Sequence, residues 1–230
     1  MTKKVLSIIP ARGGSKGLPR KNIIDFDSKP LIVSTIEASL NSKIITKTIV
    51  SSDDDEILDI SSKYNAEILK RPKNLAMDNS SSQSVVEHVL GHMDDIGEKF
   101  EFVALLQPTS PLRNHKDIDK AYKLMIDSNA NAVISVYESD NKVLKVFKKN
   151  KKGYLEGISE NKFLFMARQS LPKVYMPNGA IYIVKVEAFK KNATFLTKET
   201  ISYTMPKERS IDVDSASDID LIRNFLNNQK

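Results

Sequence analysis

The sequence predicts an α/β protein whose mainly parallel sheet is covered by helices on both faces. Short apolar segments of strand length alternate with segments of helical spacing through the first half of the 230-residue chain. This alternation is typical of parallel sheets, because each crossover helix covers one face of the sheet. Three polar or glycine-rich stretches directly follow predicted strands, so we expect them to meet at one edge, where such sheets bind ligands.

The strands of the first half are expected at five apolar or β-branched runs, over residues 5–9, 46–50, 66–69, 102–106 and 132–137. Pro10 is expected to end the first strand, because proline has no backbone N–H to donate. Apolar residues at helical spacing predict helices over residues 30–40, 57–63, 82–93 and 116–126.

The alternation breaks between about residues 142 and 175. Residues 143–147 and 154–158 flank a turn at Gly153 and predict a hairpin. Strands at 179–186 and 201–205 and an amphipathic helix at 215–227 then complete the chain. We expect one domain over residues 1–230, with residues 142–175 inserted as an arm.

The composition favours a cytoplasmic enzyme or binding protein. The chain has no cysteine, which excludes thiolate catalysis and cysteine-bound zinc, and it shows neither a signal peptide nor a run long enough for a membrane span. The net charge of +6 comes partly from lysines at 145, 148, 149, 151 and 152. A nucleic-acid binder is an alternative, but there is no tryptophan and no nucleic-acid motif, so a solvated lysine-rich surface explains that cluster better.

The glycine-rich loop after the first strand has the composition of a phosphate cradle. Its glycines allow tight turns that bring backbone N–H groups close to an anion, and four cations stand within ten residues: Arg12, Lys16, Arg20 and Lys21. Neither the P-loop spacing nor the dinucleotide spacing is present. A polyphosphate ligand is therefore predicted without a common motif, and a solvated basic turn is the alternative.

Asp212 and Asp214 form a candidate magnesium site. In an extended segment, residues two apart point to the same side, and Mg²⁺ takes one or two protein carboxylates with water and phosphate oxygens. The alternative is helix capping, since Asp214 or Ser215 stands where the last helix begins. Both interpretations are compatible.

Other polar clusters are weaker candidates. The acidic run at residues 53–55 favours a helix start over a metal site, and the pair His88 and His92 lacks a third ligand, which favours a structural role. His115 is expected at an ordinary helix start. Arg71 and the serines at residues 80–82 precede a helix and suit an anion or the edge of a base, although one serine is expected to cap that helix.

Five motifs in order resemble the acylneuraminate cytidylyltransferase family, also called CMP-sialic acid synthetases. They stand at residues 9–17 with 21–22, 71–72, 105–113, 177–182 and 211–214, and so cover nearly the whole chain. The resemblance implies a Rossmann-like nucleotidyltransferase fold. It also implies that the anomeric hydroxyl of a nine-carbon sugar acid attacks the α-phosphate of CTP, giving a CMP-sugar and pyrophosphate.

The resemblance also implies roles for individual residues. Arg12 and Lys21 would hold the triphosphate, Asn22 the ribose or phosphate region, and Arg71, Ser80 and Ser82 the cytidine. The sugar acid would face Gln107, Lys145, Arg168 and Tyr182, with Arg168 counted among the catalytic residues beside Arg12 and Lys21. Asp212 and Asp214 would hold Mg²⁺, and the arm would reach into the site of a partner in a homodimer.

One departure concerns the sugar. The residue before the motif at 177–179 is often basic in this family, but here it is Met176. N-acylneuraminate is the substrate that the resemblance favours, with legionaminate or a relative as alternatives. A synthetase for 3-deoxy-octulosonate is disfavoured, because such families space the basic loop differently. A non-catalytic CTP-binding protein is a further alternative.

Overall fold

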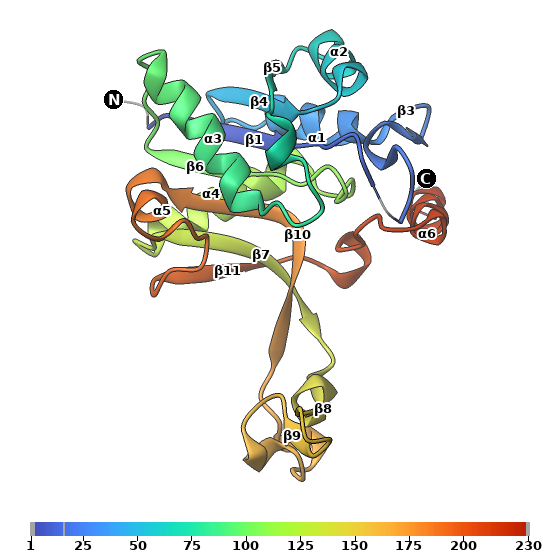
Figure 1. Ribbon diagram of the computed structural model, residues 1–230. Coiled ribbons are helices and arrows are strands. Elements are labelled where there is room, and N and C mark those ends of the chain that lie inside the picture. Colours follow the sequence, from blue (N-terminus) through green and yellow to red (C-terminus); the bar gives the residue numbers. More distant parts are fainter. Residues whose placement is uncertain (1–2, 16, 229–230) are drawn as a thin grey trace.

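The computed structural model describes residues 3–15 and 17–228. A seven-stranded sheet forms its centre, in the order β11-β7-β10-β6-β1-β4-β5. The strands are β1 (Val5–Pro10), β4 (Lys47–Ser52), β5 (Glu67–Lys70), β6 (Phe102–Leu105), β7 (Ala132–Ser139), β10 (Val174–Lys185) and β11 (Thr200–Thr204). Only β10 runs antiparallel to its neighbours, β6 and β7. The expected mainly parallel α/β fold is therefore confirmed, with one antiparallel strand (Figure 1).

Helices cover both faces of the sheet. α1 (Leu31–Leu40), α2 (Asp55–Lys63) and α4 (His115–Asp127) share one apolar core with the strands, and α3 (Ser82–Asp95) and α5 (Val186–Asn192) share the other. Alternation along β1 explains the two cores, because Val5 and Ile9 point into the first while Leu6 and Ile8 point into the second. The last helix, α6 (Ala216–Asn227), shares a third apolar cluster with the short strand β2 (Asp25–Phe26), which pairs with β3 (Lys29–Pro30).

Capping residues place the helix starts close to where the sequence predicts them. The Asp54 carboxylate accepts from the Ile57 N–H and caps α2, so the expectation of a helix start at the acidic run is confirmed. Asn114 caps α4, which begins at His115, and Ser215 forms a capping box with Asp218 at α6. Each cap satisfies backbone donors that the first helical turn leaves free.

Pro10 ends β1, as expected, but it belongs to the strand as its last residue and pairs with Ser51 of β4, so β1 is one residue longer than the expected range 5–9. The backbone N–H and C=O groups of even-numbered residues in β1 point toward β6, since the Ile8 carbonyl accepts a hydrogen bond from the Leu106 N–H. Those of odd-numbered residues point toward β4, where the Ala11 N–H donates to the Ser51 carbonyl. Because β6 ends beside Ile8, the missing N–H of Pro10 falls beyond the end of that strand and no ladder bond is lost.

Two expectations about the second half were wrong in detail. The hairpin is limited to β8 (Phe147–Lys149) and β9 (Leu155–Gly157), because a 3₁₀ helix spans Asn141–Lys145. β10 begins at Val174 instead of residue 179, with a register shift between Pro177 and Tyr182. Helix α5 was missed, since a seven-residue helix with two buried apolar side chains carries too little periodicity to recognise.

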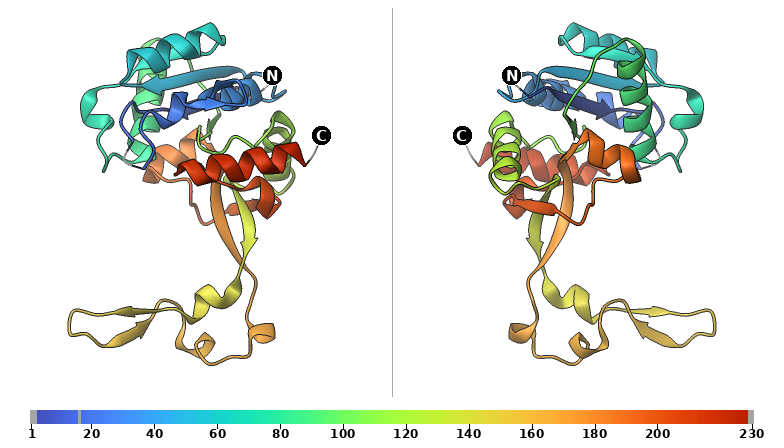
Figure 2. Two further views of the ribbon diagram at one scale, coloured as in Figure 1. Left: turned by 90° about the vertical axis from the view of Figure 1, so that its right-hand side faces the viewer. Right: turned by 90° about the vertical axis from the view of Figure 1, so that its left-hand side faces the viewer.

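The segment between β7 and β10, residues 140–173, leaves the globular part and projects as an arm (Figures 1 and 2). It corresponds to the insertion expected over residues 142–175. Several of its large apolar residues are exposed in the single chain, and Phe165 and Tyr154 are 89% and 68% exposed. Over the part of the chain that the structure describes, no helix is both long and apolar enough to cross a membrane.

Candidate active site

A polar pocket of about 270 Å³ lies where β1, β5 and β6 end. The glycine-rich loop after β1, the loop before α3 and the loop after β6 form its walls. Seven residues that the sequence analysis selected line it: Arg12, Lys21, Asn22, Arg71, Ser80, Ser82 and Gln107. The carboxyl edge of the sheet therefore brings together residues up to 95 positions apart, counted from Arg12 to Gln107.

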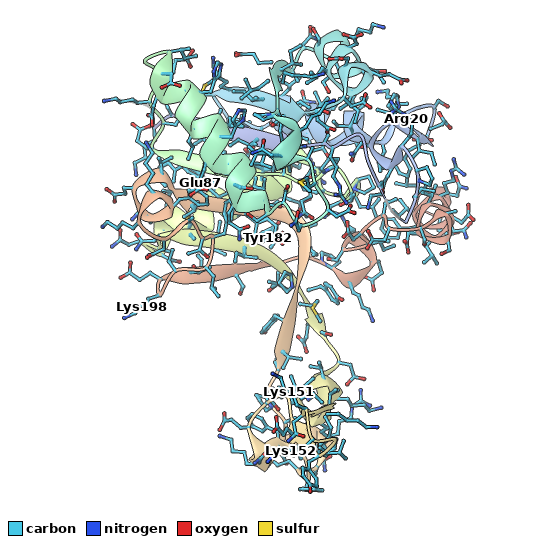
Figure 3. The ribbon with its side chains drawn as sticks, in the orientation of Figure 1. Arg20, Glu87, Lys151, Lys152, Tyr182 and Lys198 are labelled. Carbon is cyan, nitrogen blue, oxygen red and sulfur yellow. The ribbon has the colours of Figure 1, made fainter. Side chains whose placement is uncertain are left out.

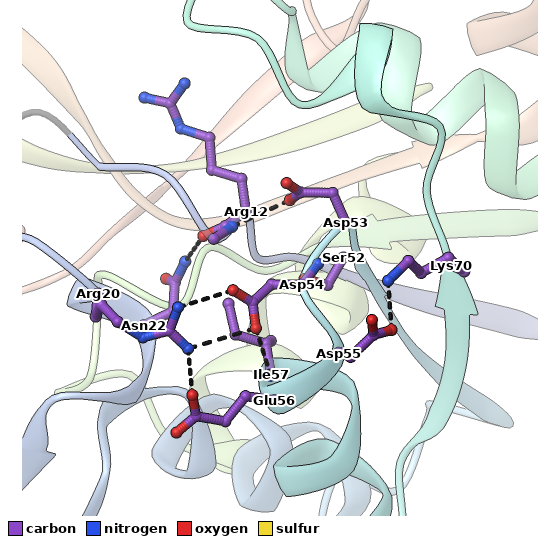
Figure 4. Close-up of polar contacts among 11 residues, drawn as sticks. Arg12, Arg20, Asn22, Ser52, Asp53, Asp54, Asp55, Glu56, Ile57 and Lys70 are labelled. Carbon is purple, nitrogen blue, oxygen red and sulfur yellow. Dashed lines mark hydrogen bonds and ion pairs between the residues drawn. The ribbon is translucent and has the colours of Figure 1, made fainter.

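Neighbouring loops hold the glycine-rich loop in place, as Figure 4 shows. The Asn22 side chain donates to the Arg12 carbonyl at 2.9 Å, and the Gly13 N–H donates to Asp53 at 3.0 Å. A Cβ at Gly13 would lie 2.6 Å from an Asp54 carboxylate oxygen, so only glycine fits this approach. The loop is thereby fixed against the start of α2.

The cations of this loop separate into two groups. Arg12 and Lys21 line the pocket, whereas Arg20 lies against α2, where it pairs with Asp54 at 2.8 Å and Glu56 at 2.6 Å. Those contacts make Arg20 a structural residue, and its hydrogen bond lowers the pKa of the Asp54 carboxyl. Lys16 lies outside the described residues.

Asp212 and Asp214 lie next to this pocket, on either side of Val213. Val213 is fully buried and its N–H donates to the Thr109 carbonyl at 2.8 Å, so the carboxylates on either side of it face away from that core. Lys21 reaches Asp214 at 2.9 Å. Partial desolvation raises the pKa of the Asp212 carboxyl and nearby Asp214 acts in the same direction, while the Thr109 hydroxyl and Lys21 lower it.

This arrangement fits a hard divalent cation. Among residues 3–15 and 17–228 there is no group of three or more histidine, aspartate or glutamate side chains placed so that it could hold a metal ion, so these residues form no complete protein cage. Two carboxylates beside a polyphosphate pocket are the donor set that Mg²⁺ uses when phosphates and water complete its shell. The Lys21 ammonium forms an ion pair with Asp214, which shows that the Asp214 carboxylate can be reached by a cation.

Arg71 and the serines support the far end of the pocket. Arg71 is almost fully buried, donates to the carbonyls of Ser51 and Leu75, and has its pKa lowered by burial. The Ser80 hydroxyl donates to the Asn74 carbonyl. Ser81 caps α3, which confirms that one serine of this run is a helix cap.

A second, less polar cavity of about 240 Å³ adjoins the first. Gln107 and Ser82 line both cavities, and Tyr182 lines the second together with Phe195 and Leu196. The rings of Tyr182 and Phe195 lie 5.6 Å apart. Burial raises the pKa of the Tyr182 hydroxyl, and Asp212 acts in the same direction. This cavity therefore lies between the loop that carries Gln107 and the loop that follows α5.

The sequence analysis did not select several residues that shape this cavity. Phe195 and Leu196 lie in the loop between α5 and β11, where no motif or periodicity marked them. Gly179 carried a signal, since it belongs to a recognised motif: its φ is +73°, and a Cβ there would lie 2.5 Å from the Gln107 side-chain oxygen. The absence of a side chain at Gly179 therefore leaves the space that the Gln107 side chain occupies.

Arg113 belongs to the motif at residues 105–113, but no role was predicted for it. It is completely buried and donates to the carbonyls of Gln107 and Ala180 and to the Thr35 hydroxyl. Burial lowers its pKa to about 10. Its three contacts hold the loop after β6 against β10, so it supports Gln107 from behind.

Lys145 and Arg168 are not near either cavity of their own chain, because they lie on the arm. The Lys145 ammonium contacts the Met166 carbonyl, and Arg168 lies 3.5 Å from Asp140. Figure 3 shows Tyr182 on the globular part and Lys151 and Lys152 far out on the arm. The structure thus separates these two residues from the other predicted site residues.

The fold and site together define a nucleotidyltransferase-like protein. A solved structure of CMP:2-keto-3-deoxy-manno-octonic acid synthetase complexed with CTP aligns with a TM-score of 0.71 at 15% identity, covering 99% of this chain and all of that one. The 4-diphosphocytidyl-2C-methyl-D-erythritol synthase from Anaerococcus prevotii aligns with a TM-score of 0.68 at 17% identity, covering 98% and 96%. These likenesses support the fold.

Sequence comparison then gives the family. The profile of the cytidylyltransferase family matches residues 6–230, and the chain belongs to this family. It is 36% identical to N-acylneuraminate cytidylyltransferase of Escherichia coli O18:K1:H7, 33% to pseudaminic acid cytidylyltransferase of Campylobacter jejuni and 32% to CMP-N,N'-diacetyllegionaminic acid synthase of Legionella pneumophila.

The relatives differ in length. The whole chain aligns with 54% of the E. coli protein, whereas 96% of it aligns with 95% of the C. jejuni protein and 94% with 93% of the L. pneumophila protein. The chain thus spans about half the length of its N-acylneuraminate relative and nearly the full length of the other two.

Proposed function

We propose that this protein transfers CMP from CTP to the anomeric hydroxyl of a nonulosonic acid, with N-acylneuraminate as the first candidate. The observation that carries the proposal is the pocket in which Arg12, Lys21 and Arg71 converge beside the pair Asp212 and Asp214. Family membership supports cytidylyl transfer, and relatives named for neuraminic, pseudaminic and legionaminic acids support a nonulosonic acceptor.

In the proposed reaction, the anomeric oxygen forms a bond to the α-phosphorus as the bond from that phosphorus to the pyrophosphate oxygen breaks. The hydroxyl proton leaves to water or a nearby base. Negative charge increases on the phosphate oxygens, so Arg12 and Lys21 would contribute mainly by position and charge. Asn22 holds the backbone of Arg12, and Arg71, Ser80 and Ser82 would receive the cytidine.

Mg²⁺ would be held by Asp212 and Asp214, with Lys21 moving from Asp214 to a phosphate. When bound, the ion would neutralise charge on the phosphate oxygens. The chain prepares the place by burying Val213 between the two carboxylates and by bonding the Thr109 hydroxyl to Asp212. We propose this role for Asp212 and Asp214 because their carboxylates are suitable Mg²⁺ ligands and lie beside the polar pocket.

The acceptor would occupy the second cavity. Tyr182 and Gln107 offer polar atoms there, while Phe195 and Leu196 offer an apolar wall. A sugar acid with an N-acyl group has both characters, and its carboxylate needs a cation. Lys145 and Arg168 would supply that cation only from the arm of a second copy, which is why we propose a homodimer.

The decisive experiment measures pyrophosphate release from CTP and Mg²⁺ with N-acetylneuraminic, pseudaminic and N,N'-diacetyllegionaminic acids as separate acceptors. We expect release with at least one of them, fastest with N-acetylneuraminic acid, and formation of the matching CMP-sugar. A faster reaction with either other acid would reassign the substrate within the proposed class. Binding of CTP without release of pyrophosphate in the presence of any of the three acids would instead support a non-catalytic CTP-binding protein.

A further inference from the structure

An ion pair spans the mouth of the nucleotide pocket. One guanidinium nitrogen of Arg12, in the glycine-rich loop, lies 2.8 Å from a carboxylate oxygen of Asp78. Asp78 belongs to the loop at residues 76–81, between the 3₁₀ helix Lys73–Leu75 and α3. Both residues line the pocket, so the pair joins two walls that approach it from different strands.

The loop that carries Asp78 is a compact turn. The Ser80 N–H donates to the Met77 carbonyl and the Ser80 hydroxyl to the Asn74 carbonyl, each at 3.0 Å. These bonds are internal to the segment from Lys73 onward and do not need Arg12. The turn therefore holds Asp78 at the pocket mouth even when Arg12 is engaged elsewhere.

The pair is weak enough to exchange. The side chains of Arg12 and Asp78 are 34% and 50% exposed, and ion pairs at such positions are largely offset by lost solvation and side-chain order. A phosphate group offers the same guanidinium several charged oxygens and can accept two parallel hydrogen bonds. A polyphosphate in the pocket would thus displace Asp78 from Arg12.

We infer that Asp78 is a gate residue: its carboxylate competes with phosphate oxygens for Arg12, yields Arg12 to the entering phosphates, and takes it back as the phosphate product leaves. This inference rests on the proposed function, since it treats Arg12 as a phosphate-binding residue. Asp78 acts through Arg12 and is a positioning residue. Its carboxylate lowers the affinity of the pocket for polyphosphate and so aids release.

The test is equilibrium binding of CTP and of inorganic pyrophosphate, each with Mg²⁺, by calorimetry. Asp78→Asn keeps the shape of the side chain and removes its charge, so both ligands should bind roughly two- to fivefold tighter than to the unmodified protein. Inhibition of turnover by added pyrophosphate should strengthen to the same extent. Unchanged or weaker binding by Asp78→Asn would overturn the inference.

Asp94→Asn is the matched control. Asp94 lies 2.6 Å from Lys190 in an ion pair whose side chains are 45% and 50% exposed, and neither residue lines the nucleotide pocket. The same charge is removed there, so its binding constants should stay at the unmodified values. A gain equal to that of Asp78→Asn would mean that net charge, and not the gate, sets the affinity, and would overturn the inference.

A double-mutant cycle tests whether Asp78 acts through Arg12. In an Arg12→Gln background the gain from Asp78→Asn should disappear, whereas a gain of the same size in both backgrounds would overturn the gate. The two proposals fail in different ways. An unmodified protein that binds CTP but releases no pyrophosphate overturns the proposed function and leaves the gate standing, while one that binds neither ligand overturns both.

Discussion

Arg12 and Arg20 stand eight residues apart in one loop, yet the structure gives them different surroundings. Arg12 lines the polar pocket, whereas Arg20 is held by Asp54 and Glu56. We expect Arg12→Ala to slow turnover by about a hundredfold or more, because a pre-positioned cation at developing charge is worth that much. Arg20→Ala should cause a far smaller loss. Steady-state pyrophosphate release distinguishes them, and equal losses would remove Arg12 from the mechanism.

Gly179 lies so close to the Gln107 side chain that no larger residue fits at position 179. Gly179→Ala would place a methyl group 2.5 Å from the Gln107 side-chain oxygen at a φ of +73°. We expect a loss of about 1–2 kcal/mol in the free energy of unfolding and a raised KM for the sugar acid, because Gln107 must move. The control is Gly91→Ala in α3, which meets nothing within 4 Å and should stabilise the protein by about 0.5–1 kcal/mol. An unchanged KM in Gly179→Ala would contradict this role for Gly179.

At the scale of elements, the start of α2 joins the glycine-rich loop to the sheet. Arg20 lowers the pKa of Asp54 below its ordinary value of 3.8, so the ionised form is favoured in the folded state. The resulting stability is present above that ordinary pKa and is lost as the pH falls through the lower folded value.

Asp54→Asn keeps a good helix cap but cannot ionise. We therefore expect the variant to be less stable than the unmodified protein at neutral pH, and the difference to shrink as acid protonates Asp54. Urea unfolding measured from neutral to acid pH follows this change. Asp127→Asn, in an exposed pair with Lys123, is the control and should show a smaller effect. A difference that grows on acidification would contradict the assignment.

At the scale of the whole molecule, the arm determines whether the proposed role of Arg168 requires a second copy of the chain. Within one chain Arg168 is far from the pocket, and the exposed Phe165 and Tyr154 suggest a covered surface in a dimer. Mixing inactive Arg12→Ala and Arg168→Ala proteins should then restore about a quarter of full activity, since random pairing makes half of the dimers mixed and each has one intact site. No restoration in mixed dimers would show that the arm does not serve the partner's site.

The sequence predicted much of the fold and the position of the site. Strands and the longer helices were recognised because their apolar residues follow clear periods. The glycine-rich loop and the loop at Gln107 were expected at one edge because both follow strands, whereas the roles of Arg12, Lys21, Asn22, Arg71 and Gln107 came from the family resemblance. Helix α5 and Phe195 were missed because short elements and apolar loops carry no such signal. The extra length of β10 depends on pairing with β7, which only the folded chain provides.

By itself, the sequence determined the class of fold, the charge of the loop after β1 and the spacing of Asp212 and Asp214, since these depend on residue order and local geometry. Only the tertiary structure decided that Arg20 faces α2, that Asp78 meets Arg12 across the pocket, and that Arg113 is buried behind Gln107. The physical reason is that each of these contacts joins segments distant in the chain, and their distance is set by the packing of strands and loops between them.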